Sequence, residues 1–385
     1  MAWKFNTRKA LQNVLREALF YASCLIPKTN TAVLRGFPAY EDNLIAIYQG
    51  LLSRPVKSII WVVDDISLLP PVALSPNTRL VKRWGLLDIY FSITSRFLFL
   101  THGHFLHGPL RNQITVNLWH GIPFKAIGRQ LGEAGRSDTM TIATSKFTQK
   151  IFSDAFNVPE AAVVITGQAR TDRMLAQERE EIWQRCFPGE PVPERIFLWL
   201  PTYRSTDMLE KETDGRDFSN VFNCSDFSEH KFNETLKASN SVCLVKPHPM
   251  ARRVENSELS NVRHISDAWL LRRGLTLYPL VGASDCLISD LSSIVADFLL
   301  LDRPIVLLFE DIDEYASSRG FSFNPITDYL PANVARTFNE FELELSSVLG
   351  GRDDCADRRA ALRGLFFDYD DANAAERILK LVFEE

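Results

Sequence analysis

The sequence predicts an α/β fold with two parallel sheets, and three observations lead to this expectation. Short apolar runs that are typical of buried strands alternate with segments of helical periodicity along the chain. The connections between them are mostly short, as in parallel sheets covered by helices. The chain has 385 residues, of which 46% are apolar, so it can bury more than one core. We therefore expect two domains whose sheets face each other across a cleft.

A first domain is predicted over residues 28–180. A helix is expected at 44–52, and the apolar run 89–93 is interpreted as a further short strand or turn. The strands expected in this domain span residues 32–34, 58–63, 97–100, 114–118, 140–143 and 163–166.

A second domain is predicted over residues 190–370, followed by a C-terminal helix at 371–385. The polar, proline-rich composition of 177–195 indicates a connection between the two domains. Residues 204–233 are rich in Asp, Ser and Phe and are expected to form either a long irregular loop near the cleft or a disordered flap. The strands expected in this domain span residues 196–200, 242–245, 262–265, 286–288 and 305–308.

The segment 1–27 is expected to form an N-terminal amphipathic helix that ends at Pro27. Basic residues accompany its apolar stripe, namely Lys4, Arg8, Lys9 and Arg16. Two interpretations stay open. The basic edge suits an anionic membrane surface, and the apolar stripe equally suits packing against the first sheet.

Composition excludes several classes of protein. A net charge of −5 and a pI near 5.9 give no attraction to nucleic acid. Six scattered cysteines without ligand spacing indicate a reduced, cytosolic protein. No apolar run is long enough for a transmembrane span, and no signal-peptide pattern is found. Three histidines, His102, His104 and His107, lack a cysteine or acidic partner, so no metal site is expected.

Two histidines follow predicted strands in different halves of the chain. Trp119-His120-Gly121 comes after the strand at 114–118, and Lys246-Pro247-His248 comes after the strand at 242–245. The carboxyl ends of parallel strands are where open α/β sheets bind ligands. A single histidine in such a turn is more often structural, but two at equivalent strand ends favour a functional role.

A pair of serines marks a third strand end. Ser292 and Ser293 lie between the strand at 286–288 and an apolar helix that begins at 294. The amides and positive dipole at a helix N-terminus bind phosphate, so we expect a nucleotide diphosphate here. The alternative is that Asp290 or Ser292 is an ordinary helix N-cap.

These motifs, in this order, resemble the CDP-glycerol glycerophosphotransferase family of teichoic acid and capsule polyol-phosphate transferases. The resemblance covers about residues 33–348 and includes N-L-W-H-G-I-P-F-K, T-S-K-F, L-P-T-Y-R, K-P-H-P, S-D-L-S-S-I-V-A-D-F and R-G-F-S-F. The chain departs from the family pattern at Ile122, where Thr is common, and at Leu291, where Tyr is common. These departures concern the acceptor and the polymer more than the fold.

The resemblance implies a GT-B-like arrangement of two Rossmann-like domains, the first on the acceptor side and the second binding the nucleotide donor. It also implies a transfer without metal or cofactor. His120 is the expected general base, because a near-neutral imidazole can accept a hydroxyl proton. His248 is expected to stabilise the leaving CMP. The expected donor-binding residues are Gly121, Pro123, Arg170, Pro201, Thr202, Lys246, Pro247, Ser292, Ser293 and Asp297.

The expected activity is transfer of glycerol phosphate, or a related polyol phosphate, from a CDP-linked donor to a hydroxyl of a lipid-linked or growing cell-surface polymer. CMP would be released in the cytoplasm, at the inner face of the membrane. Two alternatives stay open. One is a GT-B glycosyltransferase or nucleotide-sugar epimerase that uses a UDP-sugar, and the other is a non-catalytic binding protein with a degenerate site.

Overall fold

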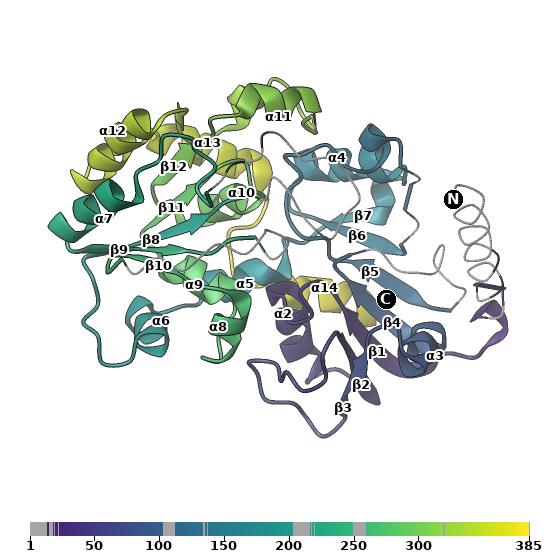
Figure 1. Cartoon of the computed structure of the whole chain (residues 1–385). Coiled ribbons are helices and arrows are strands. Elements are labelled where there is room, and N and C mark those ends of the chain that lie inside the picture. The colour runs from purple at the N-terminus through teal and green to yellow at the C-terminus, as the bar shows by residue number, and fades with distance from the viewer. Residues whose placement is uncertain are drawn as a thin grey trace, which may run out of the picture. The chain divides into compact units, whose positions relative to one another are not determined.

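The computed structural model describes residues 23–102, 112–133, 135–136, 138–202, 216, 218, 220–248, 259–318 and 320–384, together with 14, 18, 20 and 21. The chain divides into two compact units (Figure 1). Unit 1 comprises Met1–His120, Glu133–Asp172 and Asn373–Glu385, and unit 2 comprises Gly121–Gly132 and Arg173–Ala372. The chain therefore passes between the units more than once. The ranges 28–180 and 190–370 for the domains stay predictions.

Unit 1 is built on a seven-stranded sheet in the order β3-β2-β1-β4-β5-β6-β7, and each pairing is parallel. The order reverses direction between β1 and β4, which are paired. Its strands are β1 (Thr29–Arg35), β2 (Ser58–Val63), β3 (Thr78–Lys82), β4 (Ser95–Leu100), β5 (Ile114–Asn117), β6 (Met140–Ala143) and β7 (Val163–Ile165). The helices of this part of the chain are α2 (Asp42–Leu51), α3 (Leu86–Thr94), α4 (Lys146–Phe156), α5 (Ala169–Leu175) and α14 (Ala374–Phe383).

Unit 2 is built on a six-stranded parallel sheet in the order β10-β9-β8-β11-β12-β13, which reverses between β8 and β11. Its strands are β8 (Arg195–Leu200), β9 (Ser241–Val245), β10 (Val262–His264), β11 (Cys286–Ser289), β12 (Ile305–Leu308) and β13 (Val334–Ala335). Its helices are α6 (Arg179–Cys186), α7 (Glu229–Ala238), α8 (Asp267–Leu271), α9 (Leu277–Ala283), α10 (Ile294–Phe298), α11 (Ile312–Ser318), α12 (Phe338–Leu349) and α13 (Ala356–Phe366). The predicted α/β fold with parallel sheets is confirmed.

Short 3-10 turns complete the regular structure of the described residues. They are η1 (Gly128–Leu131), η2 (Glu160–Ala162), η3 (Leu299–Leu301) and η4 (Ile326–Tyr329). Among the described residues, no helix combines the length and the apolar character that a membrane span requires.

The prediction of a strand or turn at 89–93 is wrong, because these residues lie in helix α3. Asp88 and Ser92, four residues apart, are both fully buried on one face of this helix. Asp88 forms a buried ion pair with Arg35 at the end of β1. An apolar, β-branched run is ambiguous between strand and helix, and here a tertiary ion pair favours the helix.

The predicted connection at 177–195 contains a helix. Residues 179–186 form α6, whose acidic and basic side chains face solvent while Ile182 and Trp183 are buried. The sequence also gives no clear signal for β3 or β13, which the strand prediction missed. Both are edge strands, and edge strands need not be apolar on both faces.

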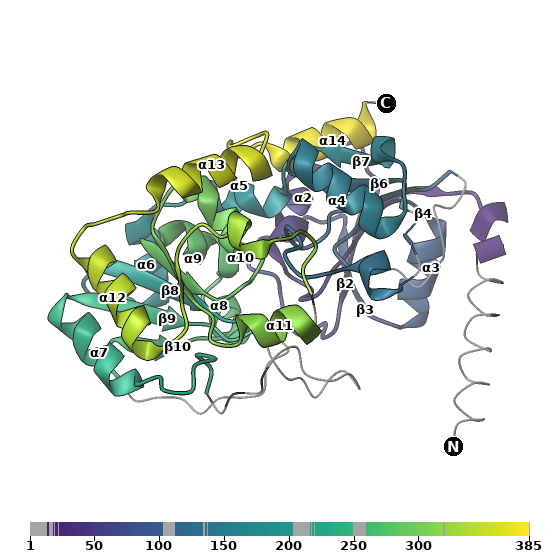
Figure 2. The ribbon, with the colours of Figure 1, turned by 90° about the horizontal axis from the view of Figure 1, so that it is seen from above.

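An aromatic cluster fills the core of unit 2 around the buried Trp199. Phe222, Phe232 and Phe341 lie 4.7, 5.8 and 5.3 Å from it between ring centroids. Helices α7 and α12 contribute Phe232 and Phe341 and lie side by side in both ribbon views (Figure 1, Figure 2). The predicted loop at 204–233 therefore contributes buried side chains to the core between residues 221 and 233 and includes the start of α7, since aromatic burial outweighs the polar composition.

The described end of the N-terminal segment packs against α3. Phe20 and Cys24 share an apolar cluster with Ile89 and Ile93. The Lys28 ammonium donates hydrogen bonds to the carbonyl oxygens of Ser23 and Ile93, at 2.7 and 2.6 Å. The basic residues expected at a membrane, Lys4, Arg8, Lys9 and Arg16, lie outside the described residues.

Substitution of Gly282 by Ala is predicted to destabilise unit 2. A Cβ at this position of α9 would stand 2.1 Å from the Met174 carbonyl oxygen, so backbone must shift, at a cost of about 1–3 kcal/mol. Gly364 in α13 has open space around it, so Gly364→Ala should stabilise by about 0.5–1 kcal/mol through helix propensity. Urea unfolding followed by circular dichroism measures both. Equal effects of the two substitutions would contradict this account.

Candidate functional site

The site in unit 1 lies where the strand order reverses. Between β1 and β4, neighbouring connections leave in opposite directions, and open α/β sheets bind ligands at this point. Thr101 directly follows β4, and its carbonyl oxygen lies 3.1 Å from Nδ1 of His120. His120 comes three residues after Asn117, the last residue of the neighbouring strand β5. The predicted strand-end position of His120 is therefore confirmed, and its catalytic role stays a prediction.

Two aromatic rings hold the imidazole of His120. The ring of His102 stacks on it with centroids 4.4 Å apart and planes 4° apart. Trp119 stacks on it at 4.2 Å, and Trp119 itself has a φ of 56°, a left-handed conformation that is uncommon for a bulky residue. The Trp119 N–H donates to Oδ1 of Asn117 at 3.2 Å, which supports this turn.

The surroundings of His120 favour its neutral form. Its imidazole keeps an exposed surface, but the protein packed around it removes much of the water that would stabilise a charged ring. This desolvation, together with His102, Arg170 and Arg136, lowers its pKa to about 3, although the bond to Thr101 opposes the shift. A carbonyl oxygen can only accept, so Nδ1 carries the proton and Nε2 carries the lone pair.

His102 is a site residue that the sequence analysis missed in this role. Desolvation, with Arg136 and Arg83, lowers its pKa to about 4, so the ring stacked on His120 is also neutral at pH 7. Its Nδ1 lies 3.0 Å from the Thr101 hydroxyl. His104 and His107 lie outside the described residues.

Arg170 lies in the same unit, in the first turn of α5, and is buried. Its backbone N–H donates to Oδ1 of Asn43 at 3.0 Å. Nearby, Glu41 caps helix α2 by accepting the backbone N–H groups of Asn43 and Leu44. Burial raises the pKa of Glu41 to about 7, against the opposing charge of Arg170. Neither Glu41 nor Asn43 carries a motif that could have identified it in the sequence.

The site in unit 2 lies where β8 and β11 end. Thr202 donates its backbone N–H and its hydroxyl to the carboxylate of Asp290, at 3.1 and 2.6 Å. Asn223 donates to the Thr202 carbonyl oxygen at 3.0 Å, and the Ser289 hydroxyl donates to the Leu200 carbonyl oxygen at 2.7 Å. These buried bonds tie the two strand ends together at the reversal of the sheet.

Ser292 and Ser293 follow this junction and are half-buried. The N-cap of α10 is Ser293, whose side chain makes no capping hydrogen bond, and Asp290 is bonded to Thr202. The alternative that Asp290 or Ser292 is the N-cap is therefore wrong. Asp297 is fully buried in α10 and accepts a hydrogen bond from the Tyr278 hydroxyl at 2.5 Å. Its expected contribution to donor binding would act through Tyr278 and the helix.

The K-P-H segment follows β9 in the same unit. Lys246 is buried and its ammonium forms an ion pair of 2.9 Å with Asp267. Pro247 and His248 are half-buried at the end of the described segment. Lys246 is therefore bound to a carboxylate within the fold, and its role in donor binding stays a prediction.

Three further residues, Gly121, Pro123 and Pro201, are predicted to bind the donor, and this role stays a prediction. Gly121 has a φ of 132°, and Gly121, Pro123 and Pro201 are buried. The segment that begins at Gly121 pairs with the R-G-F-S-F segment within unit 2, since Ser322 N–H donates to the Phe124 carbonyl oxygen at 2.9 Å and Lys125 bridges Phe321. Two motifs that are about 200 residues apart in the chain thus meet in one unit.

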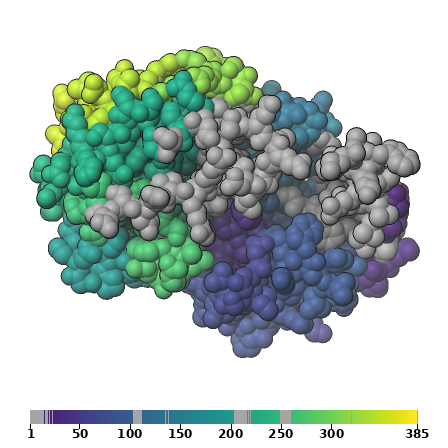
Figure 3. All heavy atoms as spheres, in the orientation of Figure 1, coloured from purple at the N-terminus to yellow at the C-terminus, as the bar shows by residue number. Residues whose placement is uncertain are grey.

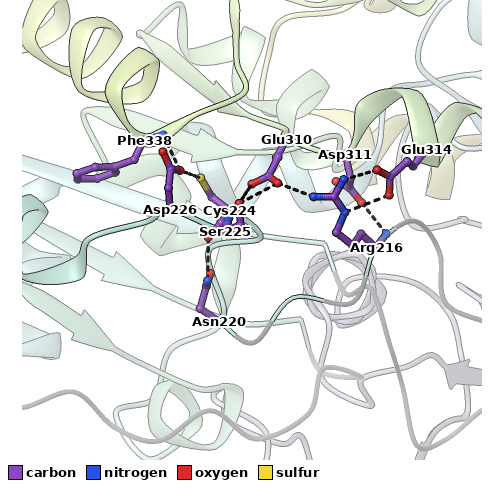
Figure 4. Close-up of polar contacts among 9 residues, drawn as sticks. All are labelled: Arg216, Asn220, Cys224, Ser225, Asp226, Glu310, Asp311, Glu314 and Phe338. Carbon is purple, nitrogen blue, oxygen red and sulfur yellow. Dashed lines mark hydrogen bonds and ion pairs between the residues drawn. The ribbon is translucent and has the colours of Figure 1, made fainter.

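Figure 4 shows the cluster of Cys224, Asp226 and Glu310, whose ligand-type atoms lie within 4.8 Å of one another. Protein donors already occupy these atoms. The Cys224 thiol and the Phe338 N–H donate to Asp226, each at 3.0 Å. Glu310 accepts from Ser225 N–H and from Arg216, each at 2.6 Å. Burial, with Asp226, raises the pKa of the Cys224 thiol. The cluster is thus a structural junction, and it supports no metal site.

Comparisons with known proteins agree on one family. The chain is 23% identical over 287 residues to teichoic acid ribitol-phosphate polymerase TarL of Staphylococcus aureus, covering 71% of this chain and 48% of the relative. It is 22% identical to the teichoic acid glycerol-phosphate transferase of the same organism, covering 98% and 99%. The chain thus spans about half the length of the first curated relatives that it matches.

Solved structures share the fold. The wall teichoic acid polymerase TagF superposes with a TM-score of 0.73 at 19% identity, covering 99% of this chain and 97% of that chain. The UDP-GlcNAc 2-epimerase of Neisseria meningitidis superposes with a TM-score of 0.52 at 10% identity, covering 92% and 100%. The sequence pattern of CDP-glycerol:poly(glycerophosphate) glycerophosphotransferases matches residues 18–384, and the chain belongs to this family.

Proposed function

We propose that the protein transfers glycerol phosphate, or a related polyol phosphate, from a CDP-linked donor to a hydroxyl of a lipid-linked or growing cell-surface polymer. The polymer would be a teichoic acid or a capsule. Family membership supports this reaction, as do the names of the relatives, which include a ribitol-phosphate polymerase and a glycerol-phosphate transferase. The observation that carries the proposal is the neutral His120, with its lone pair on Nε2, at the strand reversal of unit 1.

In this reaction the acceptor oxygen attacks the phosphorus that bears the polyol. The acceptor proton passes to Nε2 of His120, the new P–O bond forms, and the bond to CMP breaks. His120 needs no deprotonation step at neutral pH, because its pKa lies far below 7. The negative charge of the diphosphate would raise that pKa in the complex and make the imidazole a stronger base.

The donor would be bound by unit 2, with Arg170 contributing from unit 1. Ser292 and Ser293, which follow β11, are half-buried, and His248 follows β9, which is separated from β11 by β8 in the sheet. These groups suit hydrogen bonding to phosphate oxygens and to the leaving CMP. Thr202, Lys246 and Asp297 are bonded within the fold, so they would position the phosphate-binding segments. The finer architecture, a GT-B-like pair of Rossmann-like domains facing each other across a cleft, is part of this proposal.

The UDP-sugar alternative rests on structural likeness alone. The epimerase superposes at 10% identity, which supports a shared fold and no shared chemistry. The family match and the relatives favour the CDP-linked donor. No metal or cofactor is needed for the proposed steps.

An apolar surface on unit 1 supports contact with the inner face of the membrane, where a lipid-linked acceptor would be held. Two loops follow β2 and β3, whose ends are joined by the ion pair of Asp64 and Arg83. Large apolar side chains are exposed after both strands: Ile66, Leu68 and Leu69 after β2, and Trp84, Leu86, Leu87 and Tyr90 after β3 and into α3; we call these seven residues the β2–β3 patch. Figure 3 shows the part of unit 1 to which it belongs in purple and blue. Exposed Trp, Tyr and Leu are typical of membrane interfaces.

Release of CMP from a panel of CDP- and UDP-linked donors tests the proposed function. Wild-type protein should release CMP from a CDP-polyol in the presence of acceptor. His120→Ala should lower turnover by about a hundredfold or more while donor binding, measured by calorimetry, is retained. His230→Ala, at an exposed position of α7, is the control and should have no effect. UDP release instead of CMP would refute the proposal.

The dependence of kcat/KM on pH tests the state of His120. The neutral ring is the form of His120 that can accept a proton. Activity should therefore fall as the pH falls through the pKa of His120. With a pKa of about 3, kcat/KM should stay nearly constant between pH 8 and 5.5. A histidine of ordinary pKa would lose about tenfold at pH 5.5. Glu41→Gln removes a carboxyl whose pKa is near 7 and serves as the control. An acidic limb near pH 6.5 in both proteins would contradict the neutral-base assignment.

The β2–β3 patch is predicted to contribute to binding of anionic liposomes. The double substitution Trp84→Ser and Leu86→Ser should weaken co-sedimentation by about tenfold or more, since it removes apolar area from the interface. Leu343→Ser, at an equally exposed but separate leucine of α12, should have no effect. If the wild-type protein does not bind anionic liposomes at low salt, the membrane proposal is refuted.

A further inference from the structure

One buried side chain, Asn43, joins two segments that are far apart in the chain. It is the second residue of α2 and is fully buried. Its Nδ2 donates to the Trp119 carbonyl oxygen at 3.3 Å, and its Oδ1 accepts the backbone N–H of Arg170 at 3.0 Å. These partners are the residue before the proposed base and the arginine proposed to contact the donor.

The two sides of this carboxamide are not interchangeable. The amino side faces the Trp119 carbonyl oxygen and, at 3.2 Å, Oε2 of Glu41, and both of these groups are bonded as acceptors. The oxygen side faces the N–H of Arg170, which can only donate. A carboxylate of the same shape would satisfy Arg170 and leave the other side without its donors.

The bond to Trp119 matters because of the backbone conformation there. Trp119 has a φ of 56°, and a bulky residue stays in the left-handed region only where its surroundings hold it. The N–H of Trp119 donates a hydrogen bond to Oδ1 of Asn117 at 3.2 Å, and Nδ2 of Asn43 donates one to the carbonyl oxygen of Trp119. That carbonyl belongs to the peptide bond that leads into His120. Asn43 therefore helps to set the direction in which the imidazole leaves the backbone.

We propose that Asn43 is a positioning residue that aligns His120 with Arg170. The inference rests on the proposed function, in which His120 accepts the hydroxyl proton and Arg170 binds the donor. Asn43 touches neither substrate. Its side-chain amide hydrogen-bonds the backbone of both segments, so the distance between the His120 base and Arg170 stays constant.

Asn43→Asp tests this role by keeping the acceptor for Arg170 while removing the donors to Trp119 and Glu41. We expect kcat to fall about tenfold to a hundredfold, with the dissociation constant of the donor within about threefold of the wild type. The matched control is Asn233→Asp in α7 of unit 2, where a buried Asn accepts the N–H of Asn261 at 2.9 Å. This control should keep kcat within twofold. Asn43→Ser, which is too short to reach both partners, replaces Asn43→Asp if the latter fails to fold.

A second measurement separates this inference from the proposed function. Nitrogen-15 NMR of the histidine side chains, with His120→Ala to identify the signals, reports which ring nitrogen of His120 carries the proton. Wild-type protein should show the Nδ1-protonated form, and Asn43→Asp should show a mixture of both forms. Absence of CMP release by the wild type would refute the proposed function and leave this test intact. A folded Asn43→Asp protein with kcat within twofold and an unchanged His120 signal would overturn the role of Asn43.

Discussion

Parallel strand pairing is the constraint on which the rest of this structure depends. Every pairing between the described named strands is parallel, so consecutive strands must be joined by crossovers and all strand carboxyl ends in a sheet meet at one edge. Each sheet also reverses its winding once, between β1 and β4 in unit 1 and between β8 and β11 in unit 2. Polar side chains at these two points can approach one another without breaking a strand. His120 and Thr101 in one unit, and Thr202 and Asp290 in the other, occupy these positions.

The polar groups at the two reversals have different physical roles. In unit 2, Asp290 receives hydrogen bonds from Thr202 and Asn223, and this satisfied network joins the strands and limits their movement. In unit 1, the packing around His120 disfavours its charged form while the bond to Thr101 selects the tautomer. The first arrangement provides rigidity, and the second would provide the neutral proton acceptor that the proposed function requires. Phosphoryl transfer needs both, because it depends on precise positioning and on a base in the correct protonation state.

Sequence patterns predicted the strand-end motifs well because these motifs have local causes. The buried runs before His120 and His248 are continuous and apolar, as strands covered on both faces must be, and both are strands in the structure. The prediction was wrong where a distant partner outweighs local composition. At 89–93 the partner is Arg35, which pairs with Asp88, and around 220–233 it is Trp199, against which the phenylalanines pack. Neither partner can be recognised from the segment itself.

The sequence by itself determined the α/β class, most of the strands, the order of the motifs and the family to which the chain belongs. Periodicity, burial and short motifs are properties of neighbouring residues, so they can be read without coordinates. Only the tertiary structure shows which distant residues contact the residues of these motifs. The stacking of His102 on His120, the carboxamide of Asn43 between Trp119 and Arg170, and the bond from Thr202 to Asp290 join residues that are 18 to 127 positions apart. Such contacts depend on strand order and on the closure of the fold, which no local pattern encodes.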